Sequence, residues 1–138
     1  MKVMVDTNVV LDAIADRKPF SENARKIIDL ILENQLEGFI TANSTADIYY
    51  IARKHLNTDD LHTTMNSLFS IFSIVDVLGT DCHRALDSSL QDYEDALLAV
   101  CSDKINIDYI ITRDEEFLRH ATKLFLAVIS PADFLEKL

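Results

Sequence analysis

Four aspartates stand at points in the chain where carboxylates could share one site. Asp6 and Asp114 each follow an apolar, strand-like segment, whereas Asp47 and Asp95 each lie one turn into a helix-like segment. A carboxylate beside apolar strand residues is costly unless something pairs with it. Four acids gathered at one edge would repel one another, and divalent cations that prefer oxygen ligands, such as Mg²⁺ or Mn²⁺, would relieve that repulsion.

A cluster of this kind has a defined chemistry. One or two divalent cations can hold a phosphodiester and activate a water molecule, so a protein general base is dispensable. The four histidines of the chain have no metal-ligand spacing and receive no catalytic role. For a single acid near a helix N-terminus the helix dipole is a sufficient explanation, and spacing alone leaves open whether the four acids converge.

Several common sites are missing from the sequence. No GxGxxG follows the first strand-like segment, and no GxxxxGK[ST] or GxSxG occurs anywhere. The chain therefore lacks the backbone cradle of dinucleotide-binding and P-loop proteins and the nucleophile elbow of esterases.

The elements that would position the acids alternate along the chain. Short apolar segments predict strands at Lys2–Val5, Gly38–Thr41, Phe72–Val77, Tyr109–Thr112 and Phe125–Ile129. Helices are predicted from Ser21, as a cap, to just before Gly38, and over 44–55, 61–71, 81–90, 93–102 and 131–138. Strands separated by helices predict right-handed βαβ units and a three-layer α/β/α sandwich around a parallel sheet of about five strands.

Composition sets the broad class. The 138 residues, 49% of them hydrophobic, predict one packed domain over 1–138. No apolar run approaches the roughly 20 residues of a membrane helix, and the N-terminus lacks a secretory pattern, so a cytoplasmic protein without membrane contact is expected. The net charge of −10 argues against long-range attraction to nucleic acid, but bound cations can reverse the field of a carboxylate site.

The chain resembles the PIN domain family, metal-dependent nucleases whose bacterial and archaeal members are mostly VapC-type toxins of toxin–antitoxin pairs. The resemblance covers nearly the whole chain and is carried by VMVDTNVVLD, TANSTADIYYIARK, DYEDALLAV and YIITRDEEF. It implies strand order 3-2-1-4-5 and a Mg²⁺ or Mn²⁺ site. Position by position, the family's acids fall on Asp6, Asp47, Asp95 and Asp114, and its accompanying polar residues on Thr7, Asn8, Thr112 and, in a similar part, Ser44.

The second acidic position departs from the family pattern. Many PIN domains have glutamate there, and Asp47 reaches one methylene less far. A backbone shift, a water-bridged contact or weaker metal affinity would follow. Asp92, Glu115 or Glu116 are the residues that could supply the missing reach. Asp76 and Asp12 are weaker candidates, and Asp12 is expected on a solvated helix face.

Two functions follow from the resemblance. The first is an endoribonuclease that cuts single-stranded RNA, leaving 3′-hydroxyl and 5′-phosphate ends, with an antitoxin partner and a homodimeric assembly. The second is a protein-binding PIN domain with weak or absent catalysis; a DNA-directed structure-specific nuclease is a third variant. Arg113, beside Asp114, is the foremost candidate for phosphate contact, ahead of Arg17, Lys18 and Lys54.

Overall fold

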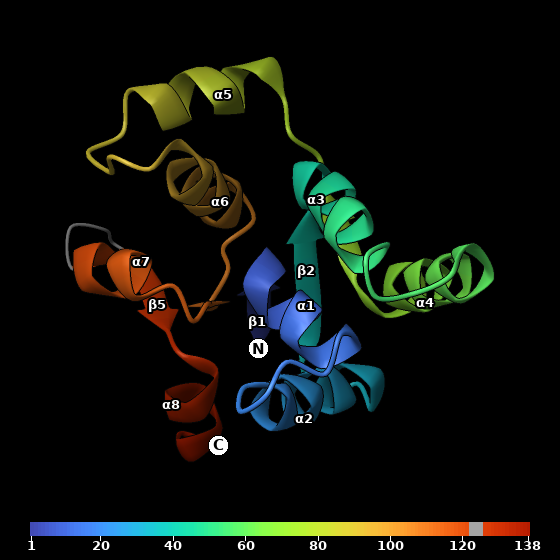
Figure 1. Ribbon diagram of the computed structural model, residues 1–138. Coiled ribbons are helices and arrows are strands. Elements are labelled where there is room, and N and C mark those ends of the chain that lie inside the picture. Colours follow the sequence, from blue (N-terminus) through green and yellow to red (C-terminus); the bar gives the residue numbers. More distant parts are fainter. Residues whose placement is uncertain (122–125) are drawn as a thin grey trace.

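A five-stranded parallel sheet forms the centre of the computed structural model, which describes residues 1–121 and 126–138. The strand order is β3-β2-β1-β4-β5, and every neighbouring pair is parallel. The strands are β1 (Lys2–Val5), β2 (Glu37–Thr41), β3 (Ser73–Val75), β4 (Tyr109–Ile111) and β5 (Ala127–Ile129). This arrangement confirms the predicted α/β/α class and the order 3-2-1-4-5 (Figure 1).

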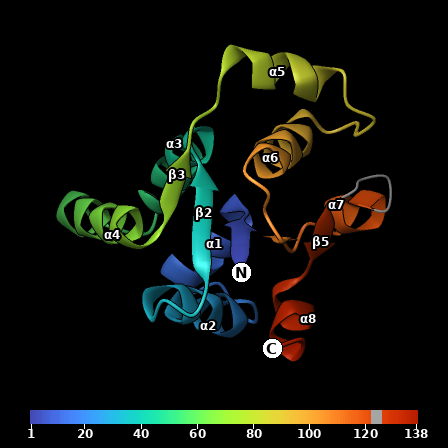
Figure 2. The ribbon, with the colours of Figure 1, turned by 180° about the vertical axis from the view of Figure 1, so that it is seen from behind.

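Helices fill the connections between these strands. They are α1 (Thr7–Ile14), α2 (Ser21–Leu32), α3 (Ala42–Ala52), α4 (Thr58–Ile71), α5 (Gly79–Leu86), α6 (Tyr93–Lys104), α7 (Glu115–His120) and α8 (Pro131–Glu136). From behind, β3 lies at the sheet edge beside β2 and next to α3 and α4 (Figure 2). In the part of the chain that the structure describes, no helix is long and apolar enough to cross a membrane.

Alternation along the strands divides the core into two layers. Val3, Val5 and Ile111 pack into a cluster with side chains from α1, α2, α3, α4 and α8. Met4 and Ile110, one residue away in the same strands, pack with side chains from α5, α6 and α7. Successive side chains of a strand point to opposite faces, so a sheet that is covered on both sides needs continuous apolar strands.

The second helix departs from prediction at both ends. Phe20 occupies the N-cap position without a side-chain hydrogen bond, and Ser21 is buried in the first turn, so the predicted Ser21 cap is wrong. The helix ends at Leu32, well before Gly38, and Asn34 takes the positive φ of 60° after it. Gly38 lies in β2, as the predicted strand Gly38–Thr41 requires, and an added Cβ there would lie 2.6 Å from Ile31 Cδ1. The close approach of a strand to a helix, not a helix terminus, explains this glycine.

Other boundaries moved by a few residues. β3 covers only Ser73–Val75, α3 and α4 begin earlier than predicted, and α5 ends at Leu86. The short helix α7, capped by Asp114, has no counterpart among the predicted elements. Phe125, the predicted start of the last strand, lies outside the described residues. Pro131 is in the first turn of α8 behind the Ser130 cap, as predicted.

Candidate active site

Asp6 connects the end of β1 to the start of α1. Its backbone is extended and its Oδ1 accepts from the Thr7 amide at 2.8 Å, which makes it the N-cap of α1. Its Oδ2 accepts from Thr112 Oγ1, also at 2.8 Å. Burial raises the pKa of Asp6, the hydrogen bonds from Thr112 and Thr7 lower it, and the charges of Asp114 and Glu94 raise it again.

Polar side chains connect the ends of β1 and β4. Asn8 Nδ2 donates to Thr112 Oγ1 at 3.3 Å, and Asn8 Oδ1 accepts from the Arg113 amide at 3.3 Å. The Asp114 amide donates to Thr112 Oγ1 at 3.1 Å. Asp114 then caps α7, because its Oδ1 accepts from the amides of the second and third residues beyond it. The fully buried Thr112 therefore joins the two strand ends, and with them two predicted ligands.

The N-terminus of α6 supplies the third predicted ligand. Asp92 caps this helix, its Oδ1 accepting from the Asp95 amide at 3.0 Å, and is exposed. Burial raises the pKa of Asp95 to about 7, and the next causes are the negative charges of Asp92, Asp114, Asp6 and Glu94. These four acids therefore lie near enough to Asp95 to form one cluster of negative charge with it, as at functional sites.

Asp47 lies on α3 and shares a small hollow with Asp6 and Glu94. This hollow of about 30 Å³ is lined by Asp6, Asp47, Glu94 and neighbouring polar residues, and has room for about one water molecule. Asp47 is exposed on α3. Ser44 also lines the hollow, but its hydroxyl is buried. That hydroxyl forms hydrogen bonds with the hydroxyl and the carbonyl oxygen of Thr41, at 2.7 and 2.9 Å. Ser44 thus stabilises the start of α3.

Sequence reasoning missed Glu94. This residue lines the hollow with Asp6 and Asp47 and raises the pKa of Asp95. The available signal was its place in the first turn of a helix whose N-terminus meets the carboxyl edge of the sheet. Neither Glu115 nor Glu116 is among the acids that perturb Asp6 or Asp95.

The prediction for Asp12 was wrong. Its side chain is 1% exposed, and it forms ion pairs with Arg17 and Arg113. The helix face expected to be solvated is covered by the chain after α1 and by the end of β4, which a sequence does not show. The Arg113 guanidinium is bound to the Asp12 carboxylate. The predicted contact of Arg113 with a phosphate stays a prediction.

The donor set fits a hard divalent cation. The clustered acids offer only oxygen atoms, which Mg²⁺ and Mn²⁺ prefer, and their mutual repulsion would fall when a cation binds. Across residues 1–121 and 126–138, no three acidic, histidine or cysteine side chains are arranged to hold an ion as they stand.

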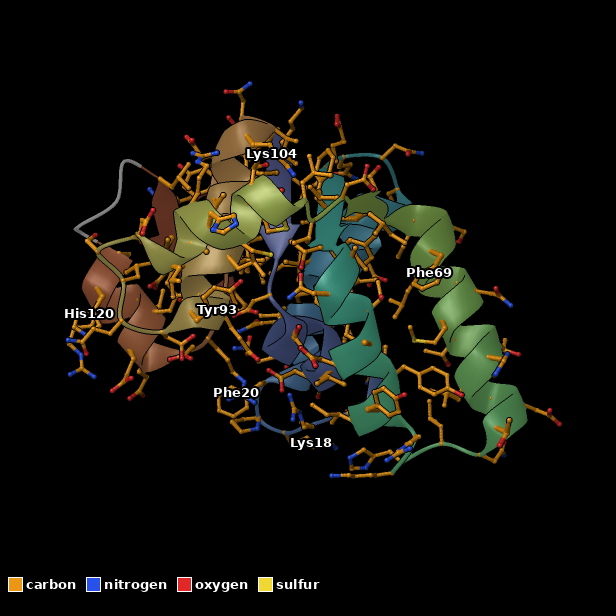
Figure 3. The ribbon with its side chains drawn as sticks, turned by 90° about the horizontal axis from the view of Figure 1, so that it is seen from above. Lys18, Phe20, Phe69, Tyr93, Lys104 and His120 are labelled. Atoms are coloured by element: carbon orange, nitrogen blue, oxygen red, sulfur yellow. The ribbon has the colours of Figure 1, made fainter. Side chains whose placement is uncertain are left out.

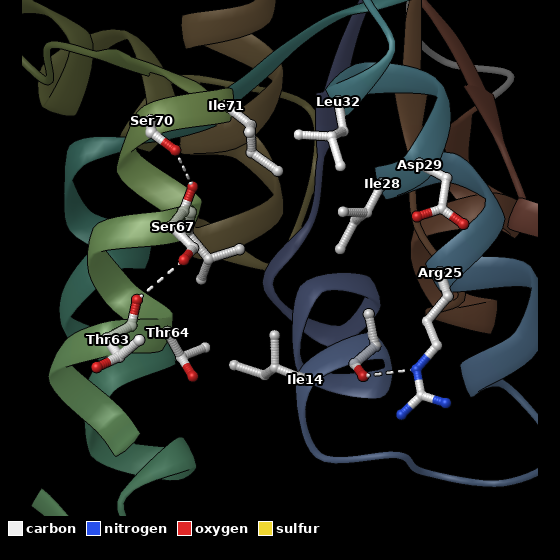
Figure 4. A pocket seen from close by; sticks show the side chains of 12 residues that line it. Ile14, Arg25, Ile28, Asp29, Leu32, Thr63, Thr64, Ser67, Ser70 and Ile71 are labelled. Atoms are coloured by element: carbon white, nitrogen blue, oxygen red, sulfur yellow. Dashed lines mark hydrogen bonds between the residues drawn. The ribbon is translucent and has the colours of Figure 1, made fainter. Parts of the chain in front are cut away.

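A larger hollow lies away from the cluster of Asp6, Asp95 and Asp114. It measures about 540 Å³ and lies between α4 and the pair α1 and α2. Ile14, Ile28, Leu32 and Ile71 point into it, with Arg25 and Asp29 along one wall and hydroxyl side chains of α4 along the other (Figure 4). Its apolar lining suits a protein or apolar ligand better than a phosphodiester.

Similarity to known proteins agrees with this architecture. "Ribonuclease VapC1" of Aquifex aeolicus (strain VF5) is 22% identical over 121 residues, which are 84% of this chain and 83% of that protein. The structure of VapBC2 from Rickettsia felis bound to a promoter DNA fragment contains a chain that matches with a TM-score of 0.68 at 15% identity. That match covers 94% of this chain and 98% of the other.

A toxin–antitoxin complex from Klebsiella pneumoniae contains a similar chain, with a TM-score of 0.68, 17% identity and coverage of 94% and 97%. At such low identities, the TM-scores of 0.68 show a shared fold and nothing more. The sequence model of the PIN domain family matches residues 2–116, a span that contains all four predicted acids. The chain therefore belongs to the PIN domain family.

Proposed function

We propose that this protein is a divalent-metal-dependent endoribonuclease that hydrolyses phosphodiester bonds of single-stranded RNA and is the toxin of a toxin–antitoxin pair. One observation carries the proposal: Asp6, Asp95 and Asp114, which are far apart in sequence, lie close enough for the charge of one to raise the pKa of another. Membership of the PIN family and the similarity to a protein named ribonuclease support the same reaction.

In this proposal the acids divide the work. Asp6, Asp95 and Asp114 would hold Mg²⁺ or Mn²⁺, with Asp47 and Glu94 contributing from the hollow beside Asp6. A bound cation of this type activates water and stabilises charge on the phosphate. Thr112 fixes the orientation of the Asp6 carboxylate by donating to Oδ2. Asp92 holds the α6 terminus in place and adds negative charge beside Asp95.

Glu94, across the hollow, supplies part of the reach that the short Asp47 side chain lacks. Glu94 carries the longer carboxylate and faces the same space from α6. The sequence alone offered Asp92, Glu115 or Glu116 for this role, and the hollow favours Glu94 instead.

An antitoxin is the proposed protein partner. The Klebsiella pneumoniae structure is described as a toxin–antitoxin complex, and the Rickettsia felis structure as VapBC2 bound to a fragment of its promoter DNA. The larger hollow, shown in Figure 4, offers a partner a place to bury side chains. Leu32, which lines it, is 59% exposed and could be covered by a partner. The net charge of −10 favours a basic partner.

A homodimer is proposed through the surface of α3 and α4. In the apolar segments 48–52 and 68–74, Ile48, Leu68 and Phe72 are buried, whereas Tyr50 and Phe69 are 56% and 44% exposed. Aromatic side chains exposed on adjacent helices are typical of interfaces. Sedimentation velocity should show a dimer, and a monomer at high concentration would contradict this assembly.

The second candidate function is protein binding without catalysis. It is favoured by Asp47, which is exposed on α3 and reaches one methylene less far than the glutamate that many PIN domains have at this position. Both functions retain the antitoxin-like partner, so binding of a partner does not distinguish them.

Cleavage assays separate the two functions. End-labelled single-stranded RNA should be cut by the purified protein with Mg²⁺ or Mn²⁺ and remain intact with EDTA, leaving 5′-phosphate ends. Asp6→Asn should lose cleavage, and calorimetry should show weaker Mn²⁺ binding, because one ligand charge is gone while the carbonyl oxygen can still cap α1. Cleavage by Asp6→Asn at the wild-type rate, or activity in EDTA, would contradict the proposal.

A further inference from the structure

We infer that Asp12 is a positioning residue: through Arg113 it holds the segment that carries Asp114 against the end of β1. The inference rests on the proposed function in one respect: its test includes a measurement of Mn²⁺ binding. The Asp12 carboxylate lies in α1 and is 1% exposed, so it cannot itself meet the substrate. Its importance must come from the groups that it binds.

Arg113 binds Asp12 through two of its nitrogens. Arg113 Nη2 donates to Asp12 Oδ1 at 2.9 Å, and Arg113 Nε donates to Oδ2. A planar guanidinium that binds both oxygens of a carboxylate fixes direction as well as distance. Arg113 directly precedes Asp114, so the orientation of one constrains the backbone of the other.

Arg17 and Phe20 complete the clamp that Asp12 and Arg113 form. Arg17, after α1, donates from Nε to Asp12 Oδ1 at 2.8 Å and from Nη2 to the Asn8 carbonyl at 3.1 Å. The Phe20 ring covers the Arg113 guanidinium, whose central carbon lies 4.1 Å from the ring centroid. In Figure 3, Tyr93, which begins α6, lies between Phe20 and Lys104, the residue at the other end of that helix.

The clamp also contacts residues of the candidate site. The Arg113 amide donates to Asn8 Oδ1, and Asn8 donates to Thr112 Oγ1 and lies two residues from Asp6. A buried ion pair is weak evidence for stability, because removing charges from water offsets much of their attraction. Geometry is the better account of this one, since the bidentate pair joins α1 to the residue beside Asp114 across 101 positions of sequence.

The test uses Asp12→Asn with Asp81→Asn as its matched control. Asp81 is a second buried aspartate, 3% exposed and paired with Lys104, but it lies in α5, away from the Asp114 segment. Both variants remove one buried charge. Mn²⁺ affinity by calorimetry should fall about tenfold or more in Asp12→Asn and stay unchanged in Asp81→Asn, as is typical when an outer-shell partner of a ligand is lost.

Hydrogen exchange tests the clamp without any metal. Amide exchange over residues 112–118 should accelerate in Asp12→Asn and stay at the wild-type rate in Asp81→Asn. Arg113→Gln should match Asp12→Asn in both measurements, and Arg113→Lys should recover part of the affinity because it keeps the charge but not the two-nitrogen contact. If Asp12→Asn fails to fold, the double variant Asp12→Asn/Arg113→Gln carries the same expectations, because it removes the Arg113 charge together with that of Asp12 and leaves only the part-exposed Arg17 without its carboxylate.

Three outcomes would overturn the inference. They are wild-type exchange over 112–118 in Asp12→Asn, an equal loss of Mn²⁺ affinity in Asp81→Asn, and an Arg113→Gln variant that cuts RNA slowly with unchanged Mn²⁺ affinity. The last result would make Arg113 a phosphate ligand. If the wild type binds no Mn²⁺, the proposed function fails, and the exchange measurement still decides whether Asp12 positions the Asp114 segment.

Discussion

Replacing Asp92 by Asn should lower the pKa of Asp95. Burial is the largest cause of the rise in that pKa from 3.8 to about 7, and the charge of Asp92 is the next. Asp92 therefore accounts for no more than about half of the rise, and we expect the pKa to fall by roughly one unit. Asparagine keeps an oxygen to accept from the Asp95 amide, so the α6 cap remains while the charge is removed.

The assay is a pH titration of the Asp95 carboxyl carbon by NMR in metal-free protein. Wild type should titrate near pH 7 and the variant about one unit lower. Glu116→Gln serves as the control, because it removes an acid that is not among the charges perturbing Asp95, and no change in the pKa is expected. A wild-type Asp95 that titrates near its ordinary value of 3.8, or an unchanged pKa in Asp92→Asn, would refute the electrostatic cluster.

The same pKa predicts how stability depends on pH. A folded-state pKa above the unfolded value means that the folded protein holds the Asp95 proton more tightly. The contribution of Asp95 to the free energy of unfolding is therefore present below about pH 4 and is lost as pH rises from there to about 7. Chemical denaturation of the metal-free protein should show this decline, and Asp92→Asn should reduce it. Mn²⁺ should restore stability above about pH 7, because it binds the ionised carboxylate.

Three further predictions concern the site, the sheet and the substrate. Asp47→Glu should strengthen Mn²⁺ binding or speed cleavage and Asp47→Ala should weaken both, as measured by calorimetry and RNA cleavage; a wild-type rate in the Ala variant would remove Asp47 from the site. Gly38→Ala should lower the free energy of unfolding by about 1–3 kcal/mol in chemical denaturation, since its Cβ would meet the buried Ile31, whereas Gly79→Ala, with nothing within 4 Å, should cost nothing. Cleavage should favour unpaired over duplex RNA and fall only modestly across a salt series, because a chain of net charge −10 neutralises few phosphates; a steep loss with salt would contradict this.

Local sequence information was enough to predict the class of fold and the residues that end its strands. Continuous apolar segments such as Val3 to Val5 predicted a sheet covered on both faces, and the structure places Val3 and Met4 in opposite layers. Asp6, directly after β1, and Asp114, three residues after the end of β4, were identified because polar residues that follow a buried strand are visible without any knowledge of distant contacts. Helix ends were less predictable. In the sequence Gly38 looks like the residue that follows a helix terminus, whereas in the structure it packs closely on Ile31.

Which side chains meet depends on how the elements pack, and this was visible only in three dimensions. Asp12 looks like a solvated helical residue until Arg17 and Arg113, one of them 101 positions away, are brought onto it. Glu94 looks like an ordinary acid in the first turn of a helix until that turn is set beside Asp6. Periodicity reports which face of an element is apolar, but contacts between distant elements depend on how those faces pack, and a charged residue becomes buried only where its partner arrives from another part of the chain.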